Sequence, residues 1–346
     1  MKKKMVAMLL VLTMIGSLTG CGKTEDTGGN TTNTDAGARS GEGGGSAESI
    51  VSGEGEDGQV ITEGSLEFVY VTQDSANSYF IQVYEGFSSK CEELGVRTQI
   101  LDAKYDVAAQ VSYVEDAVQR GVDGIMISPL DENALKNIVD EAKEKGIVVS
   151  AEAQPVSNAQ IDGSLDEYNI GYSIGSAAAQ WINEQQGGEG KALILAQDDV
   201  EAVIRRGDGI NDGILENAPN AEIVARQNAS NTDLGMKVTE SVILANPEVN
   251  VICACDDFTA IGSYEAVSAM QNIADSFYIG GCDATDEGKE KMKAENSVYR
   301  SSCNLFPYEA GEELAEAMYV YLTETQEDAV VERRYEPVWQ QDVIEQ

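Results

Sequence analysis

The stretch GVDGIMISP, residues 121–129, decides the fold. Its apolar core, GIMI at 124–127, is short and stops at Ser128 and Pro129, which is typical of a strand buried on both faces of a parallel sheet. Amphipathic segments at 108–120 and 133–145 flank it as predicted helices, and further strands are predicted at 66–71, 98–101 and 147–150, with a helix at 78–93. Strands that alternate with helices in this way predict a parallel sheet covered by helices on both faces.

The same alternation begins again after residue 190. Strands are predicted at 191–195, 221–225, 250–254 and 277–280, and helices at 202–215, 233–245, 258–270 and 286–294. A chain of 346 residues also exceeds what one hydrophobic core usually supports. The predicted fold class is therefore α/β, with two doubly wound parallel-sheet lobes and a ligand cleft at the carboxyl ends of their strands.

Composition excludes several classes of function. The chain has 60 acidic and 23 basic residues, a net charge of −37, and this charge repels nucleic acid. It has no histidine, which excludes Ser-His-Asp and Cys-His catalysis and removes the commonest metal ligand. We expect no enzymatic activity, no cofactor, no metal and no nucleic-acid partner.

The six cysteines are widely scattered and resemble neither a zinc cluster nor a dense disulfide framework. Cys253 and Cys255 share one face of a predicted buried strand, where we expect small apolar packing. Oxidation of Cys282 with a neighbouring cysteine stays open at this point.

The amino terminus predicts export and anchoring. Residues 1–20 combine Lys2, Lys3 and Lys4 with an apolar run at 5–15 that is short for a membrane span, as in a signal peptide. LTGC at 18–21 then resembles the lipobox of bacterial lipoproteins, in which the cysteine, here Cys21, is diacylated on its sulfur and becomes the first residue after cleavage. Residues 21–64 are rich in Gly, Ser, Thr, Asp and Glu, and we expect them to form a flexible tether from the membrane.

Several short segments, in this order and at this spacing, resemble one known family. They are NSYF at 77–80, GVDGIMISP at 121–129, IRRGDG at 204–209, CDD at 255–257 followed by AIG at 260–262, and GCD at 281–283. The chain from residue 66 to about 343 resembles the type I periplasmic sugar-binding proteins, the ribose-binding group in particular. The resemblance implies a substrate-binding lipoprotein of an ABC transporter, with two lobes joined by a three-strand hinge.

The resemblance also implies the residues that contact the ligand. Asn77, Tyr79 and Phe80 would do so from the first lobe, and Arg206, Asp256 and Asp283 from the second, with Asn304 near a crossover. Aromatic planes suit the apolar faces of a sugar, while amides, carboxylates and a guanidinium bind its hydroxyls. The sequence leaves other roles open, because the aromatic residues could be helix core and each aspartate a helix N-cap. We expect Asp257 to be the cap and Asp256 the ligand contact.

The chain also departs from the ribose-binding pattern. Those proteins have an Asp-Arg pair after the fourth strand, where this chain has Glu152 and Ala153, and Asp256 stands in place of an asparagine. Glu152 is therefore the eighth predicted ligand contact. The more acidic cleft favours another pentose, a hexose, a polyol or a positively charged ligand over ribose.

Together these features predict an extracytoplasmic, lipid-anchored, monomeric protein that captures a small sugar or polyol and delivers it to an ABC import permease. The predicted first lobe comprises residues 65–164 with 305–328, and the second comprises 165–304 with 329–346. Two alternatives stay open: a ligand sensor for a membrane receptor, and a nucleoside- or autoinducer-binding lipoprotein of the same fold.

Overall fold

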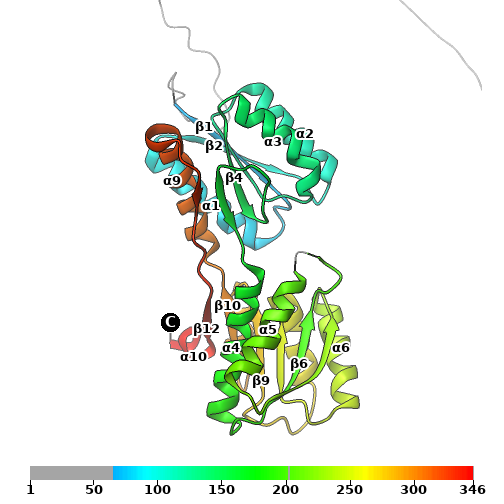
Figure 1. Cartoon of the computed structure of the whole chain (residues 1–346). Coiled ribbons are helices and arrows are strands. Elements are labelled where there is room, and N and C mark those ends of the chain that lie inside the picture. Colours follow the sequence, from blue (N-terminus) through cyan, green and yellow to red (C-terminus); the bar gives the residue numbers. More distant parts are fainter. Residues whose placement is uncertain (1–64, 202, 346) are drawn as a thin grey trace, which may run out of the picture. The chain divides into compact units, whose positions relative to one another are not determined.

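The structure is a computed structural model that describes residues 65–201 and 203–345 (Figure 1). The predicted signal peptide, Cys21 and the tether lie outside the described residues. The described chain forms two six-stranded sheets, each covered by helices, and this confirms the predicted fold class. No helix in the described ranges combines the length and apolar character needed to cross a bilayer.

The first sheet has the strand order β11-β5-β4-β3-β1-β2, and all its pairs are parallel. Its strands are β1 (Glu67–Thr72), β2 (Arg97–Asp102), β3 (Gly124–Ile127), β4 (Val148–Ala153), β5 (Ile161–Ser164) and β11 (Ala329–Val330). The helices α1 (Ser78–Leu94), α2 (Val107–Arg120), α3 (Glu132–Glu144) and α9 (Pro307–Val320) belong to this lobe.

Strands β1 and β3 of this sheet are apolar on both faces because both faces are covered. Phe68 and Tyr70 of β1 pack in one cluster with α1 and α9, while Val69 and Val71 pack in another with α2 and α3. Alternate residues of a strand point to opposite faces, so a continuous apolar run is what a doubly covered strand requires. The quoted stretch behaves in the same way, since all four residues of β3 are buried.

The second sheet has the order β12-β10-β9-β8-β6-β7 and is parallel except for β12, which runs antiparallel to β10. Its strands are β6 (Lys191–Ala196), β7 (Glu222–Asn228), β8 (Val251–Ala254), β9 (Tyr278–Cys282), β10 (Tyr299–Asn304) and β12 (Glu336–Trp339). Its helices are α4 (Glu167–Gln185), α5 (Ile204–Asn217), α6 (Thr232–Ala245), α7 (Asp257–Ser268), α8 (Asp286–Lys293) and α10 (Gln340–Glu345). A short π-helix, η1 (Tyr321–Thr325), follows α9.

The chain passes between the two sheets three times. The crossings follow β5, β10 and β11, at residues 165–166, 305–306 and 331–335. Helix α9 packs on α1, so the segment after the second crossing returns to the first lobe. Because β11 pairs with β5, the first lobe continues to Val330, past the predicted boundary at residue 328.

Candidate ligand-binding site

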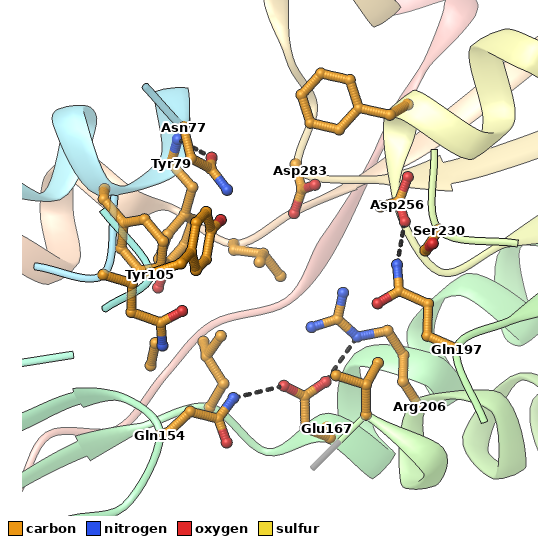
Figure 2. Close-up of a pocket in the computed structure, with 17 residues that line it drawn as sticks. Asn77, Tyr79, Tyr105, Gln154, Glu167, Gln197, Arg206, Ser230, Asp256 and Asp283 are labelled. Carbon is orange, nitrogen blue, oxygen red and sulfur yellow. Dashed lines mark hydrogen bonds and ion pairs between the residues drawn. The ribbon is translucent and has the colours of Figure 1, made fainter. Parts of the chain in front are cut away.

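A cavity of about 400 Å³ lies where the carboxyl ends of strands from both sheets meet (Figure 2). Clefts of this size at such strand ends are the usual ligand sites of doubly wound folds. The residues that line it are Gln73, Asn77, Tyr79, Phe80, Tyr105, Ala153, Gln154, Leu165, Glu167, Gln197, Val203, Arg206, Ser230, Asp256, Phe258, Asp283 and Leu305. Six of the eight predicted contacts are therefore brought together here.

The start of α1 forms one wall. Asn77 is the N-cap of the helix, because its Oδ1 accepts a hydrogen bond from the Tyr79 backbone N–H at 2.9 Å. Tyr79 and Phe80 are 8% and 6% exposed and meet edge to face, with ring centroids 5.2 Å apart. Both aromatic residues thus pack in the core and also reach the cavity, so the two roles that the sequence left open coexist.

Glu152 does not line the cavity, although the sequence predicts it as a ligand contact. Its carboxylate is fully buried and accepts hydrogen bonds from Tyr79 Oη at 2.6 Å, from Tyr70 Oη at 3.3 Å and from Ser128 Oγ. Arg333 Nη1 lies 3.8 Å from it. Burial and the charge of Glu152 raise the pKa of Tyr79 well above its ordinary value, so this hydroxyl stays protonated as a donor. Glu152 therefore does not line the cavity itself but holds, through a hydrogen bond, the hydroxyl group of Tyr79, a residue that does.

Asn304 also does not line the cavity. It ends β10, and its Oδ1 accepts a hydrogen bond from the Phe306 backbone N–H at 3.0 Å. The side chain therefore shapes the second crossing, and the neighbouring Leu305 reaches the cavity instead.

Arg206 of α5 enters from the second lobe. Its Nε donates to Glu167 Oε2 at 2.7 Å and its Nη1 donates to the carbonyl oxygen of Cys255 at 2.8 Å. The two charged side chains are 10% and 7% exposed, so this ion pair is largely removed from water. Gln154 Nε2 lies 3.4 Å from the other oxygen of Glu167, as Figure 2 shows.

Asp256 lines the cavity and also caps a helix. Its Oδ1 accepts a hydrogen bond from the Thr259 backbone N–H at 2.7 Å, which makes it the N-cap of α7, and its other oxygen accepts one from Gln197 Nε2. The prediction that Asp257 is the cap is wrong. Asp257 is fully buried and accepts hydrogen bonds from three side chains and one backbone N–H, donated by Thr285, Tyr299 and Ser302.

Asp283 follows β9 in a strained backbone conformation, with φ of 95°. Its backbone N–H donates to the carbonyl oxygen of Cys303 at 2.8 Å, which fixes the turn. Burial and the nearby Asp257 raise the pKa of the Asp283 carboxyl to about 7, an effect that Arg206 offsets only in part. This carboxylate is thus held where its charge is unfavourable until a donor or a cation arrives.

Several cavity residues escaped the sequence-based prediction. Gln154 and Gln197 directly follow β4 and β6, and Ser230 lies two residues after β7, so the rule that ligands meet strand ends would have found them. Tyr105 follows β2, and it is 58% exposed at the cavity. Glu167 begins α4, a helix that the sequence analysis did not predict.

The cysteines lie in the core, as expected for Cys253 and Cys255, which are fully buried. All five cysteines in the described residues are free thiols. Burial raises the pKa of the Cys255 thiol to about 12. The described residues contain no group of three or more Cys, Asp or Glu side chains placed to hold a metal ion.

Known proteins share both the sequence pattern and the fold. The ABC transporter periplasmic-binding protein YphF of Escherichia coli is 24% identical over 249 residues, which span 70% of this chain and 74% of that protein. The ribose import binding protein RbsB of Haemophilus influenzae is 28% identical over 220 residues, 63% of this chain and 73% of that protein. The crystal structure of an ABC transporter solute-binding protein from Actinobacillus succinogenes with bound D-allose aligns with a TM-score of 0.71 at 22% identity, covering 82% of this chain and all of that one.

Residues 68–326 match the family described as periplasmic binding protein domain. That span includes every residue that lines the cavity and most of both sheets, and it ends before β11 and β12. The chain belongs to the type I periplasmic sugar-binding proteins of ABC transporters.

Proposed function

We propose that this protein is a lipid-anchored, monomeric solute-binding protein that captures a small sugar or polyol in the cavity and hands it to an ABC import permease. The cavity carries this proposal, because it combines aromatic side chains with amides, carboxylates and one guanidinium from two lobes joined by three short crossings. Such a set suits a ring or chain with apolar faces and hydroxylated edges. Binding without chemistry agrees with a sequence that has no histidine.

The relatives support the ligand class. Proteins with 25–28% identity are ribose import binding proteins, and a protein of Mycolicibacterium smegmatis with 23% identity over 250 residues is a xylitol-binding protein. Both names denote small polyhydroxylated molecules, which a cavity of about 400 Å³ can hold.

A thermal-shift screen of the purified chain against pentoses, hexoses, polyols and nucleosides tests the ligand class. A ligand that binds only the native state at 100 times its Kd adds about 2.7 kcal/mol of stability. We expect a rise in melting temperature with one or a few sugars or polyols. A rise with nucleosides alone would overturn the proposed class.

A pair of variants ties the response to the cavity. Tyr105→Ala removes an aromatic side chain that is 58% exposed and lines the cavity, whereas Tyr308→Ala removes one that is 38% exposed and lies outside it. We expect Tyr105→Ala to reduce the thermal response and Tyr308→Ala to leave it unchanged. Equal effects of the two variants would place binding elsewhere.

The anchor rests on the sequence around Cys21 and is tested separately. Two acyl chains suffice for stable anchoring, so the expressed protein should enter the detergent phase in a Triton X-114 partition, and the Cys21→Ser variant should stay in the aqueous phase. Wild-type protein in the aqueous phase would contradict the lipid anchor without affecting the ligand class.

A further inference from the structure

The cavity has more negative charge than its positive charge can balance. Four side chains that line it are charged, and they are Glu167, Arg206, Asp256 and Asp283. Among the described lining residues Arg206 is the one basic side chain, and its Nε is already paired with Glu167 at 2.7 Å. Asp256 and Asp283 therefore form no salt bridge with a described residue, although the charge of Arg206 opposes the raised pKa of both carboxyls.

The two remaining carboxylates differ in what they bind. Asp256 is 8% exposed and accepts hydrogen bonds only from neutral donors, the Thr259 backbone N–H and the Gln197 amide. No N–H or O–H group of the described residues donates to the Asp283 carboxylate. Figure 2 shows Asp283 and Asp256 on the side of the cavity that faces Asn77 and Tyr105, with open space between the two sides. Asp283 is thus an acceptor at the cavity wall for which the described residues supply only the weak thiol donor of Cys282.

A further buried carboxylate near Asp283, that of Asp257, adds to the excess of negative charge. The carboxylate of Asp257 is fully buried, and its hydrogen-bond partners are three hydroxyls and one backbone N–H, so it adds negative charge without adding a cation. The raised pKa of Asp283 reflects the same surroundings. Burial raises it most, the negative charges of Asp257 and Asp256 raise it further, and the positive charge of Arg206 lowers it. A ligand that displaces water from this wall leaves the carboxylates unsatisfied unless it brings hydrogen-bond donors, and it leaves the excess negative charge unbalanced unless it brings a positive charge.

The rest of the cavity suits hydroxyl groups. Gln154, Gln197 and Ser230 offer amide and hydroxyl groups, and Tyr105 and Phe258 offer exposed aromatic surface. The ligand that matches both parts has several hydroxyls and one cationic group. A protonated primary or secondary amine fits better than a quaternary ammonium, because Asp283 accepts hydrogen bonds and, of these cationic groups, only the protonated amine has N–H bonds to donate.

We propose that the cavity binds an amine-bearing sugar or polyol, with its ammonium group against Asp283 and its hydroxyls on the amide side chains and Arg206. This inference rests on the proposed solute-binding function and narrows its ligand class to sugars and polyols that carry an amine.

Isothermal titration of the purified full chain with matched ligand pairs tests the inference. The pairs are glucosamine with glucose, galactosamine with galactose, and an aminoinositol with myo-inositol, and the N-acetyl derivatives of the two amino sugars retain the ring but remove the charge. We expect at least one amine to bind roughly tenfold or more tightly than its hydroxyl counterpart, and acetylation to abolish this preference. The affinity for the amine should also fall as salt is raised, while that for a neutral partner should not.

Asp283→Asn and Asp286→Asn form a matched pair of variants. Asparagine tolerates positive φ, so Asp283→Asn keeps the turn while it removes the charge. Asp286 undergoes the same change three residues away, at a fully exposed position outside the cavity. We expect Asp283→Asn to weaken amine binding roughly tenfold or more and to leave the neutral partner nearly unchanged, and we expect Asp286→Asn to change neither.

The outcomes separate the two proposals. If a neutral sugar binds as tightly as its amine and Asp283→Asn changes neither affinity, the inference is overturned and the solute-binding function stands. If no sugar, polyol or amine binds the wild-type chain, the proposed function is overturned as well.

Discussion

Arg333 connects the three crossings between the lobes, and its removal gives a sharp test of how the site is supported. Its side chain is only 3% exposed. Nη1 donates to the carbonyl oxygen of Gly163 at 2.8 Å, beside the first crossing, and Nη2 donates to Leu305 in the second crossing at 3.5 Å. Nη2 also donates to Tyr79 Oη at 3.1 Å, so one guanidinium in the third crossing contacts the end of β5 beside the first crossing, the second crossing and a cavity wall.

The variant Arg333→Met keeps much of the side-chain length and removes the charge and its donors. Glu152 then loses its nearest cation while its carboxylate stays fully buried. Removing one partner of a buried ion pair usually costs about 3–5 kcal/mol. Glu152 still accepts hydrogen bonds from hydroxyl groups, including that of Tyr79 at 2.6 Å, so we expect a loss near the lower end, about 3 kcal/mol.

Urea unfolding measures this loss, and two signals locate it. Far-UV circular dichroism reports both lobes, whereas both tryptophans, Trp181 in α4 and Trp339 in β12, belong to the second lobe. The matched control is Arg334→Met, because Arg334 is 49% exposed and lies 3.6 Å from a surface partner, Glu313. We expect the free energy of unfolding of the control variant to fall by less than about 1 kcal/mol.

A double variant tests whether the buried charge is the cause. Arg333→Met with Glu152→Gln leaves no unpaired carboxylate, so we expect it to be more stable than Arg333→Met alone by about 1–2 kcal/mol. The reasoning is refuted if Arg333→Met loses no more than Arg334→Met, or if the two single losses simply add in the double variant.

Three further predictions concern packing and charge. Gly171→Ala places a Cβ 1.9 Å from the carbonyl oxygen of Arg206 at the contact between α4 and α5, so urea unfolding should show a loss of about 3 kcal/mol or more in the free energy of unfolding. The control Gln180→Ala, at an exposed position on the same helix, should change this free energy little. Asp257→Asn replaces a carboxylate that accepts four hydrogen bonds with an amide that accepts fewer, and the same assay should show a loss of about 2–3 kcal/mol; no loss would mean that these bonds are not made. The pKa of Asp283 is about 7 in the folded state and 3.8 without its surroundings, so between these values the folded state binds more protons and its stability falls as pH rises. The ligand-free protein should therefore melt at a higher temperature at pH 5 than at pH 7.5, and Asp283→Asn should reduce this difference in melting temperature.

Most of the fold is readable from the sequence because its central strands are buried on both faces. Runs such as residues 124–127 and 191–195 are apolar without interruption, and glycine-, proline- or aspartate-containing turns bound them. Strand β5, with the sequence IDGS, lacks such a run, and α4 is rich in glycine and alanine, which blurs its amphipathic pattern. Both elements went unpredicted. Glu167 was lost from the predicted site with α4, because a residue cannot be placed at a strand or helix end that is not recognised.

The errors at the site have a different cause, which is contact between distant parts of the chain. Nothing near Glu152 in the sequence indicates that Arg333 approaches it, so a carboxylate directly after a strand looks like a ligand contact. Asp256 and Asp257 are adjacent, and the choice between cap and buried acceptor depends on where Thr285, Tyr299 and Ser302 fold. Local patterns therefore identify the cleft, while its inner hydrogen bonds need the tertiary structure.

Acidic residues alone say little in a chain with a net charge of −37, since most of them are solvated at the surface. Asp256 and Asp283 differ because they line a cavity, are buried or half-buried, and form no salt bridge with a described residue. Burial raises the pKa of both, so the folded protein is less stable at neutral pH than it would be with neutral side chains there. A binding site is where such a loss is compensated, because a cationic ligand that lowers both pKa values recovers that free energy as affinity. The same imbalance therefore links the pH dependence of stability to the preference for an amine, and Asp283→Asn should weaken both together.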